Sequence, residues 1–256
     1  MDMIKKSLVM VTVFAMALST SVLVAGDTET DEQEAVESEI MESEVVEPAA
    51  VVGEPAELVE QEEEIAAEVA AGEAPKGREI AAGACAGCHN PDGNSIIPTF
   101  PSLAGQHPEY LLKQLIDFKA DEGGTAARQS DAMTPMVAAL SDEDMEDLVA
   151  FYAEQEATPG QTTGSEDLLA IGRVLYHGGN IENGVPACAS CHGPTGKGIP
   201  PHYPALAGQH APYTLTQLDL FNKGQRTNDN GVMQQVLTRM SGTEKRAVSE
   251  YIQGLR

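Results

Sequence analysis

Two short cysteine motifs carry the residues best suited to chemistry. CAGCH spans residues 85–89 and CASCH spans residues 188–192, and together they hold all four cysteines of the 256-residue chain. Each motif places two thiols three positions apart, with a histidine directly after the second. The pattern C-x-x-C-H is typical of covalent haem attachment, in which both thiols form thioethers and the imidazole binds iron.

The motifs therefore predict two covalently bound haem c groups. The thioethers would form at Cys85 and Cys88, and at Cys188 and Cys191. His89 and His192 would bind the irons. A metal-bound histidine usually donates its other ring nitrogen to an oxygen acceptor, which fixes its tautomer. We expect the backbone near Pro101 and Pro204 to provide that acceptor; the alternative is that these prolines only stiffen a turn.

Three other uses of paired cysteines compete with haem attachment. A thioredoxin-type redox site needs a β-α-β context, and no stretch of the chain alternates persistently enough to predict a sheet. A structural zinc site needs four ligands, whereas each motif offers two cysteines and an adjacent histidine. A structural disulfide is compatible with an exported protein. None of the three explains the histidine in both copies, so haem attachment is favoured.

The sixth iron ligand separates an electron carrier from an enzyme. Methionine or histidine there gives a carrier, whereas an open position admits a small ligand or peroxide. Met133 and Met233 each lie seven residues before an LS or MS pair, while Val236 stands opposite Met136. We therefore predict Met133 and Met233 as iron ligands. Met136 and Met240 are predicted to be core residues, the commoner role of methionine.

The four histidines outside the motifs are predicted to have lesser roles. His107 and His210 align within a repeated AGQH turn directly before a helix, so we predict them to be polar turn residues. His177 and His202 have no counterpart in the first half of the chain. We expect them at the surface or beside the haem ligands.

The elements that must position these residues come as a tandem repeat. PSLAGQHPEYLLKQL at 101–115 aligns with PALAGQHAPYTLTQL at 204–218, at the same offset as the cysteine motifs. Each half predicts helices before the cysteines, after AGQH, and at its end. The last helices begin at Ser141 and Ser241, each with an acidic residue three positions on, which is a capping-box signature.

The N-terminal region has the pattern of a targeting and linking sequence. Two lysines and an apolar stretch precede Ala25, so residues 1–25 are predicted to be a signal peptide, or an uncleaved anchor because the stretch is long. Residues 26–74 are predicted to be an acidic disordered linker. From 27 to 74 the chain has 18 acidic side chains and no lysine or arginine.

The repeat then predicts two domains, at 75–158 and 165–256, joined by a linker at 159–164. The first has 14 acidic and 5 basic side chains, a net charge of −9, and the second has 7 and 8, a net charge of +1. One hypothesis is that the acidic half and the linker orient the molecule toward a basic patch on a redox partner. A solvated acidic helix in the first half explains the asymmetry equally well.

The quoted segments together resemble the dihaem cytochrome c4 family over residues 75–256. The resemblance implies an all-α fold of two tandem class I cytochrome c domains, with neighbouring haem edges and electron transfer in the bacterial periplasm. It implies redox partners such as a bc1 complex and a terminal oxidase. It places the iron ligands on His89, Met133, His192 and Met233 and the thioethers on the four cysteines. The long acidic linker departs from the family.

The sequence thus predicts an electron carrier of a respiratory chain rather than an enzyme. The alternatives are a dihaem peroxidase, which requires an iron that can open a coordination position, and a cytochrome subunit of a dehydrogenase complex. A haem-free disulfide or metal-binding module is the weakest alternative. We expect a periplasmic monomer without a nucleic-acid partner, attached to the membrane at most through its N-terminal segment.

Overall fold

The structure is a computed structural model that describes residue 69, residues 72–120 and residues 124–256. The predicted signal peptide and most of the predicted acidic linker lie outside these residues. All of the described residues belong to one compact unit of the chain. Among them, no helix combines the length and the apolar character needed to cross a membrane.

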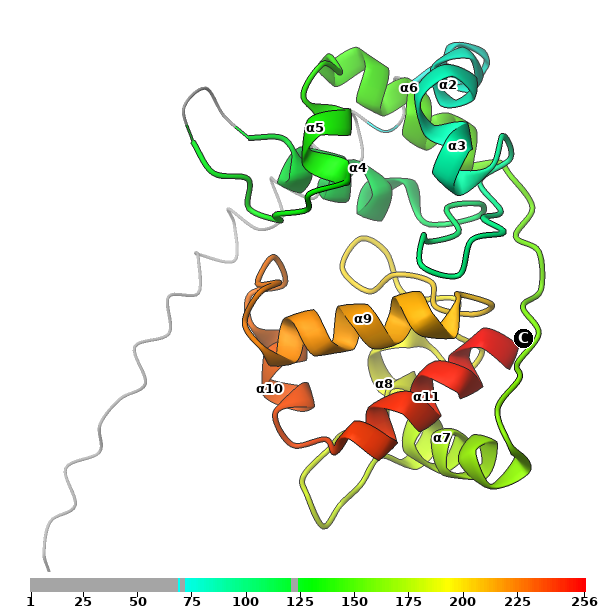
Figure 1. Ribbon diagram of the computed structural model, residues 1–256, viewed down its shortest axis with the longest axis vertical. Helices are drawn as coiled ribbons and strands as arrows, with labels where there is room; N and C mark the ends of the chain where they lie inside the picture. Colours follow the sequence, from blue (N-terminus) through cyan, green and yellow to red (C-terminus); the bar gives the residue numbers. More distant parts are fainter. Residues whose placement is uncertain (1–68, 70–71, 121–123) are drawn as a thin grey trace, which may run out of the picture. The chain divides into compact units, whose positions relative to one another are not determined.

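The first half consists of short helices, two of which contain the CAGCH motif (Figure 1). In chain order they are α2 (Ala74–Ile80), the π-helical turn η1 (Ala81–Cys85), α3 (Ala86–His89), α4 (Pro108–Phe118), α5 (Met133–Val137) and α6 (Asp142–Ala153). Helices α2 and α4 both pack against α6. The sequence predicts one helix before the cysteines. In the structure the α-helix ends at Ile80, and a π-helical turn continues the chain to Cys85.

The second half repeats this arrangement around CASCH. Its helices are α7 (Glu166–Gly178), α8 (Ala189–His192), α9 (Ala211–Asn222), α10 (Val232–Leu237) and α11 (Gly242–Gly254). Helices α7 and α9 pack against α11, and α10 packs against α9. In the described part of the chain the only β-structure is two isolated bridges, Asn180 with Val185 and Ile199 with Tyr203. The predicted all-α architecture is confirmed.

Local sequence signals explain where the main helices begin. Helices α4 and α9 each have a proline in the first turn, where a missing backbone N–H costs nothing. The predicted capping boxes are both present. The Ser141 hydroxyl accepts from the Asp144 N–H at 3.1 Å, and the Ser241 hydroxyl accepts from the Glu244 N–H at 3.2 Å. Each cap stabilises its helix by about 0.5–2 kcal/mol.

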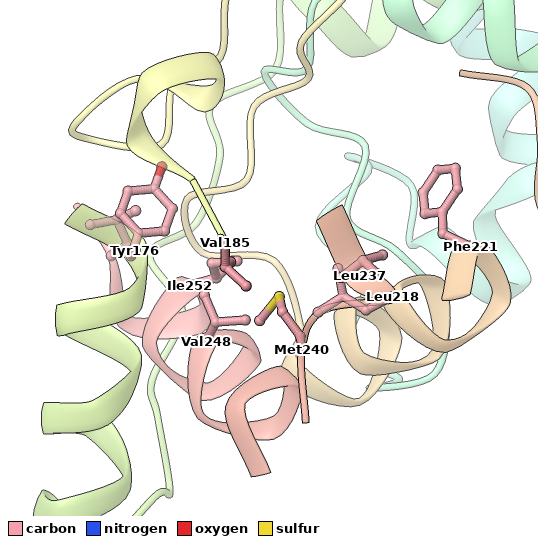
Figure 2. Packing of buried hydrophobic residues seen from close by; sticks show 9 residues of the cluster. Tyr176, Val185, Leu218, Phe221, Leu237, Met240, Val248 and Ile252 are labelled. Carbon is pink, nitrogen blue, oxygen red and sulfur yellow. The ribbon is translucent and has the colours of Figure 1, made fainter. Parts of the chain in front are cut away.

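Each half has its own apolar core. Figure 2 shows the core of the second half, which brings together side chains from α7, α9 and α11. Its buried members are Tyr176, Val185, Leu218, Phe221, Leu237, Met240, Val248, Ile252 and Leu255. The core of the first half consists of Ala81, Leu111, Leu112, Met145, Leu148, Val149, Phe151 and Tyr152. Both cores lie beside the cysteine motifs, since Cys85 and Cys188 pack against them.

Gly172 lets α7 and α11 approach closely, and this leads to a first prediction. A Cβ atom at 172 would collide with the backbone carbonyl of Ala247 on α11. We expect Gly172→Ala to lower the free energy of unfolding by about 1–3 kcal/mol, because the helices must move apart. Gly178→Ala on the same helix is the matched control, since a Cβ there would meet nothing within 4 Å. Equal denaturant midpoints for the two variants would contradict this.

Candidate functional site

The two motif histidines are buried and are held in the same way. His89 ends α3 and His192 ends α8, with only 5% and 8% of their surfaces exposed. Nδ1 of His89 donates to the Pro101 carbonyl at 2.8 Å, and Nδ1 of His192 donates to the Pro204 carbonyl at 3.1 Å. The predicted acceptors are confirmed. Because a carbonyl only accepts, the proton lies on Nδ1 and Nε2 keeps its lone pair for a metal.

Burial keeps both imidazoles in the form that binds a metal. Removal from water lowers the pKa of His89 and of His192 below the ordinary histidine value, against a smaller opposing effect of the proline carbonyls. Both rings are therefore neutral at pH 7. A neutral imidazole with Nε2 free is the ligand that haem iron takes from proteins.

The four cysteines are free thiols beside these histidines. Burial raises the pKa of Cys85, and it raises the pKa of Cys188 to about 11. Within the described ranges, no group of three or more histidine, cysteine, aspartate or glutamate side chains is arranged to hold a metal ion. The geometry thus lends no support to the disulfide and zinc alternatives, whereas free thiols next to a buried imidazole suit haem attachment.

The predicted methionine ligands occupy equivalent places in the two halves. Met133 is the first residue of α5 and Met233 is the second residue of α10, and both are half-buried. A side chain anchors each backbone N–H. Met133 donates to the Ser130 hydroxyl at 3.1 Å, and Met233 donates to the Asp229 carboxylate at 2.6 Å. The two methionines therefore occupy equivalent backbone positions in the two halves.

The two other methionines behave differently from each other. Met240 is 8% exposed within the second core, so its predicted core role is confirmed. Met136 is 45% exposed, and the prediction that it is a core residue was wrong. In the short helix α5, Val137 takes the inward position and is 1% exposed. Its neighbour Met136 points about 100° away around the helix axis.

The four histidines outside the C-x-x-C-H motifs fall into two groups. The exposed ring of His177 lies with Nε2 2.9 Å from the Tyr251 hydroxyl, and the exposed ring of His202 packs edge-on against Tyr203. Their predicted surface positions are confirmed. His107 and His210 are more than turn residues, because each contacts the opposite half through Nε2. These bonds end on the carbonyls of Lys197 and Ser95, each at 2.7 Å.

The glutamines that precede His107 and His210 also reach across. The Gln106 side-chain amide bonds the N–H and the carbonyl of Ala205, at 2.8 and 2.9 Å. The Gln209 amide bonds the same two groups of Ser102, both at 3.0 Å. Sequence reasoning missed this contact. Its signal was a polar Gln-His pair present in both copies of a turn that needs neither side chain.

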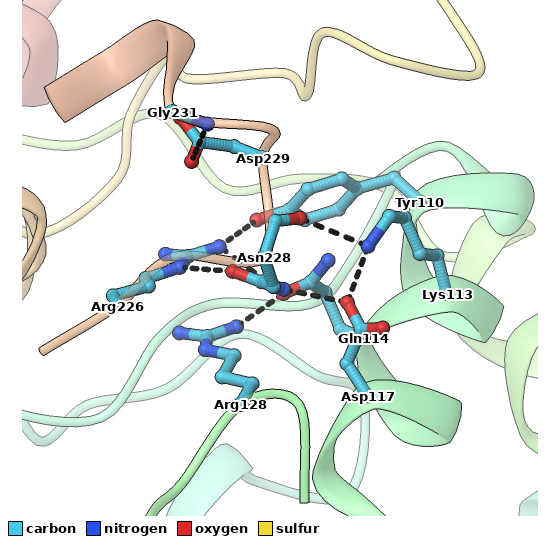
Figure 3. A network of polar contacts seen from close by, with 9 residues as sticks. All are labelled: Tyr110, Lys113, Gln114, Asp117, Arg128, Arg226, Asn228, Asp229 and Gly231. Carbon is cyan, nitrogen blue, oxygen red and sulfur yellow. Dashed lines mark hydrogen bonds and ion pairs between the residues drawn. The ribbon is translucent and has the colours of Figure 1, made fainter. Parts of the chain in front are cut away.

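A buried cluster of polar side chains also joins the two halves (Figure 3). Arg128 and Arg226 are each only 7% exposed. The guanidinium of Arg128 lies 4.4 Å from the ring centre of Phe118, and that of Arg226 lies 4.3 Å from the ring centre of Phe221. These stacks hold two arginines, one from each half, in place without exposing them to water.

Both guanidiniums share the same uncharged acceptors. Arg128 donates to the side-chain oxygens of Gln114 and Gln217, at 2.6 and 2.7 Å. Arg226 donates to the same two oxygens, at 3.1 and 2.9 Å. Each also donates to a tyrosine hydroxyl of the opposite half. Sequence reasoning did not identify either arginine.

The cluster is electropositive. Burial alone would raise the pKa of Tyr110, but Arg226, Arg128 and Lys113 together outweigh that effect and lower it. The carboxylates of Asp117 and Asp229 belong to the same cluster, but Arg128 and Arg226 donate only to uncharged side chains. Burying a guanidinium among uncharged partners is costly unless an anion compensates it. The carboxylates of a haem group meet that requirement. The buried imidazoles and the free thiols fit a haem c in each half, and the chemistry of the cluster suits the haem carboxylates.

Comparison with known proteins decides the family. The cytochrome c family description matches residues 74–154 and 172–256. Cytochrome c4 of Thiocapsa roseopersicina is 46% identical over 72% of this chain and 93% of its own. The crystal structure of reduced recombinant cytochrome c4 from Pseudomonas stutzeri matches with a TM-score of 0.66 and 40% identity, over 72% of this chain and 100% of that one. This chain belongs to the cytochrome c4 family.

Membership of the cytochrome c4 family confirms the predicted architecture and role. The protein is a dihaem electron carrier, not an enzyme, with two tandem cytochrome c domains and two covalently bound haem c groups. The peroxidase and dehydrogenase-subunit alternatives are not favoured. A further relative is the thiosulfate dehydrogenase electron acceptor of Stutzerimonas stutzeri (strain A1501), 39% identical over 68% of this chain and 80% of its own.

Proposed function

We propose that each domain binds its haem iron through one histidine and one methionine. The pairs are His89 with Met133 and His192 with Met233, and the thioethers form at Cys85, Cys88, Cys188 and Cys191. The observation that carries this proposal is a buried imidazole with Nδ1 committed to a carbonyl, present at both C-x-x-C-H motifs. Methionine opposite histidine raises the reduction potential, which suits the high-potential end of a respiratory chain.

Haem c supplies one-electron chemistry between Fe(II) and Fe(III) when it is bound. The residues of the chain supply binding, orientation and charge. Arg128 and Arg226 would hold the haem carboxylates, since their buried guanidiniums have uncharged partners within the protein. Each haem is proposed to be bound by one domain, residues 75–158 for the first and residues 165–256 for the second, with residues 159–164 as the linker between them.

We propose that the protein works in the bacterial periplasm, between a bc1 complex and a terminal oxidase. Membership of the cytochrome c4 family supports a periplasmic carrier, as does the pattern of a signal or anchor in residues 1–25. The relative named as a thiosulfate dehydrogenase electron acceptor supports a second donor, a thiosulfate-oxidising dehydrogenase. An anchored form would raise the local concentration of the carrier near membrane complexes.

The test is electron delivery to and from the haem-loaded protein. The protein is mixed with bc1 complex and quinol, with thiosulfate dehydrogenase and thiosulfate, or, once reduced, with a terminal oxidase. We expect complete reduction by at least one donor and rapid reoxidation by the oxidase. Slow exchange with all three, together with steady turnover of hydrogen peroxide, would overturn the carrier proposal in favour of a peroxidase.

The charge difference between the domains predicts a salt-dependent encounter. If the acidic first domain steers the molecule, the rate constant of electron transfer to a partner with a basic patch should fall on the order of tenfold between 0.01 and 0.15 M ionic strength. Stopped-flow absorbance measures this rate constant. Reduction by an uncharged small-molecule reductant is the control and should change little. A rate constant that does not depend on salt would contradict steering. The charge difference between the domains would then reflect only a solvated acidic helix.

A further inference from the structure

One peptide group in the first domain connects a motif histidine to the second domain. The carbonyl of Pro101 accepts from Nδ1 of His89 at 2.8 Å. The N–H of that same peptide group belongs to Ser102, and it donates to the side-chain oxygen of Gln209 at 3.0 Å. Gln209 closes the contact by donating to the Ser102 carbonyl at 3.0 Å. A rigid peptide plane thus lies between the imidazole of one domain and the amide of the other.

The second domain contains the same arrangement with the roles of the two domains exchanged. The Pro204 carbonyl accepts from Nδ1 of His192 at 3.1 Å, and the N–H of the same peptide group, from Ala205, donates to Gln106 at 2.8 Å. Gln106 also donates to the Ala205 carbonyl at 2.9 Å. Both chains of hydrogen bonds therefore cross between the domains, in opposite directions.

Such a chain affects the histidine in two ways. The two bonds to the glutamine fix the orientation of the peptide plane, and with it the direction of the carbonyl that holds the ring. A hydrogen bond to the peptide N–H also polarises the carbonyl and makes it a stronger acceptor. A stronger acceptor at Nδ1 makes the imidazole a more basic ligand. A more basic ligand stabilises Fe(III) over Fe(II) and lowers the reduction potential.

We propose that Gln209 and Gln106 are positioning residues that act across the domain boundary. Gln209 lowers the reduction potential of the haem in the first domain, and Gln106 lowers that of the haem in the second. The inference rests on the proposed ligation of iron by His89 and His192. It gives each domain control over the haem of the other, so that separation or reorientation of the domains raises both potentials.

The test uses the haem-loaded full chain with Gln209→Ala and Gln106→Ala. A redox titration followed by proton NMR resolves the haem methyl signals of each domain, assigned through contacts to neighbouring residues. We expect Gln209→Ala to shift electron occupancy toward the first haem by up to about tenfold, equivalent to about 59 mV for one electron. Gln106→Ala should shift it toward the second haem. The Nδ1 proton of the affected histidine should move upfield as its bond weakens.

Matched controls separate this effect from a looser domain contact. His107→Ala and His210→Ala also remove one bond between the domains each, but these bonds end on Lys197 and Ser95 rather than on the peptides that hold the motif histidines. Both control variants should leave the distribution of electrons between the two haems unchanged. Equal shifts of both haems, a shift of the haem in the same domain as the variant, or no shift would each overturn the proposal.

Failure of the ligand assignment gives a different result. The optical spectrum of every variant should keep its Soret band and its sulfur-to-iron band at full two-haem intensity. If the unsubstituted protein already lacks those bands, the proposed ligation fails before the glutamines are tested. If the bands are intact and the potentials do not respond as expected, only the action of Gln106 and Gln209 is refuted.

Discussion

Replacing Met233 by alanine is expected to open the iron of the second haem. The sulfur-to-iron band should fall to half, and that haem should bind cyanide rapidly and lose potential on the order of 0.1 V or more. The physical reason is that methionine favours Fe(II), and axial ligands set haem potentials over a span of about 0.8 V. Visible spectra with potentiometry measure both effects. Met133→Ala should do the same to the first haem.

The other methionine of each half is its matched control. Met240 is buried, so Met240→Ala should lower the free energy of unfolding by about 2–5 kcal/mol and leave the band intact. Met136 is exposed, so Met136→Ala should change neither stability nor spectrum by much. A half-intensity band in Met240→Ala or Met136→Ala, with a full band in Met233→Ala or Met133→Ala, would show that the wrong methionine had been assigned.

Replacing Arg226 by methionine is expected to lower both the reduction potential and the stability. Arg226 donates to Gln114, Gln217 and Tyr110. Arg128 still donates to both glutamine oxygens in the variant, so the Tyr110 hydroxyl is the acceptor that loses its arginine, at a cost of about 1–3 kcal/mol. Loss of a buried positive charge also disfavours the reduced haem, which carries one positive charge fewer than the oxidised haem. Potentiometric titration and denaturant unfolding of the haem-loaded protein measure the two effects.

A second arginine of the same domain supplies the control. Arg239 is exposed and donates to the Gly184 carbonyl at 2.8 Å, so Arg239→Met removes the same charge where water screens it. We expect its potentials and unfolding midpoint to stay close to those of the unsubstituted protein. If Arg226→Met and Arg239→Met behave alike, the buried cluster does not hold an anionic part of the haem.

The features that the sequence predicted correctly are local ones. The capping boxes at Ser141 and Ser241 depend on residues three positions apart, and α4 and α9 begin directly after the AGQH turns, where the sequence places helices. The acceptors at Pro101 and Pro204 follow from the general rule that a metal-bound histidine donates its second ring nitrogen to an oxygen acceptor, applied to both copies of the repeat. Two copies of one pattern gave a comparison that a single domain would not provide.

The features that the sequence did not predict depend on tertiary packing. The exposure of Met136 follows from Val137 taking the inward position on a helix too short to show a period. The partners of Gln106 and Gln209 lie about a hundred residues away, and no local pattern identifies a backbone acceptor at that distance. The same holds for Arg128 and Arg226, whose shared acceptors come from both halves.

The optical spectrum of the haem-loaded protein, oxidised and reduced, tests the central claim most directly. The claim is that each of two haems is held by one histidine and one methionine and serves electron transfer. It predicts a weak sulfur-to-iron band in the red at two-haem intensity in the oxidised protein, with slow reaction toward cyanide and peroxide. A band at half intensity with rapid reaction of one haem with peroxide would contradict it, because one iron would then lack its methionine.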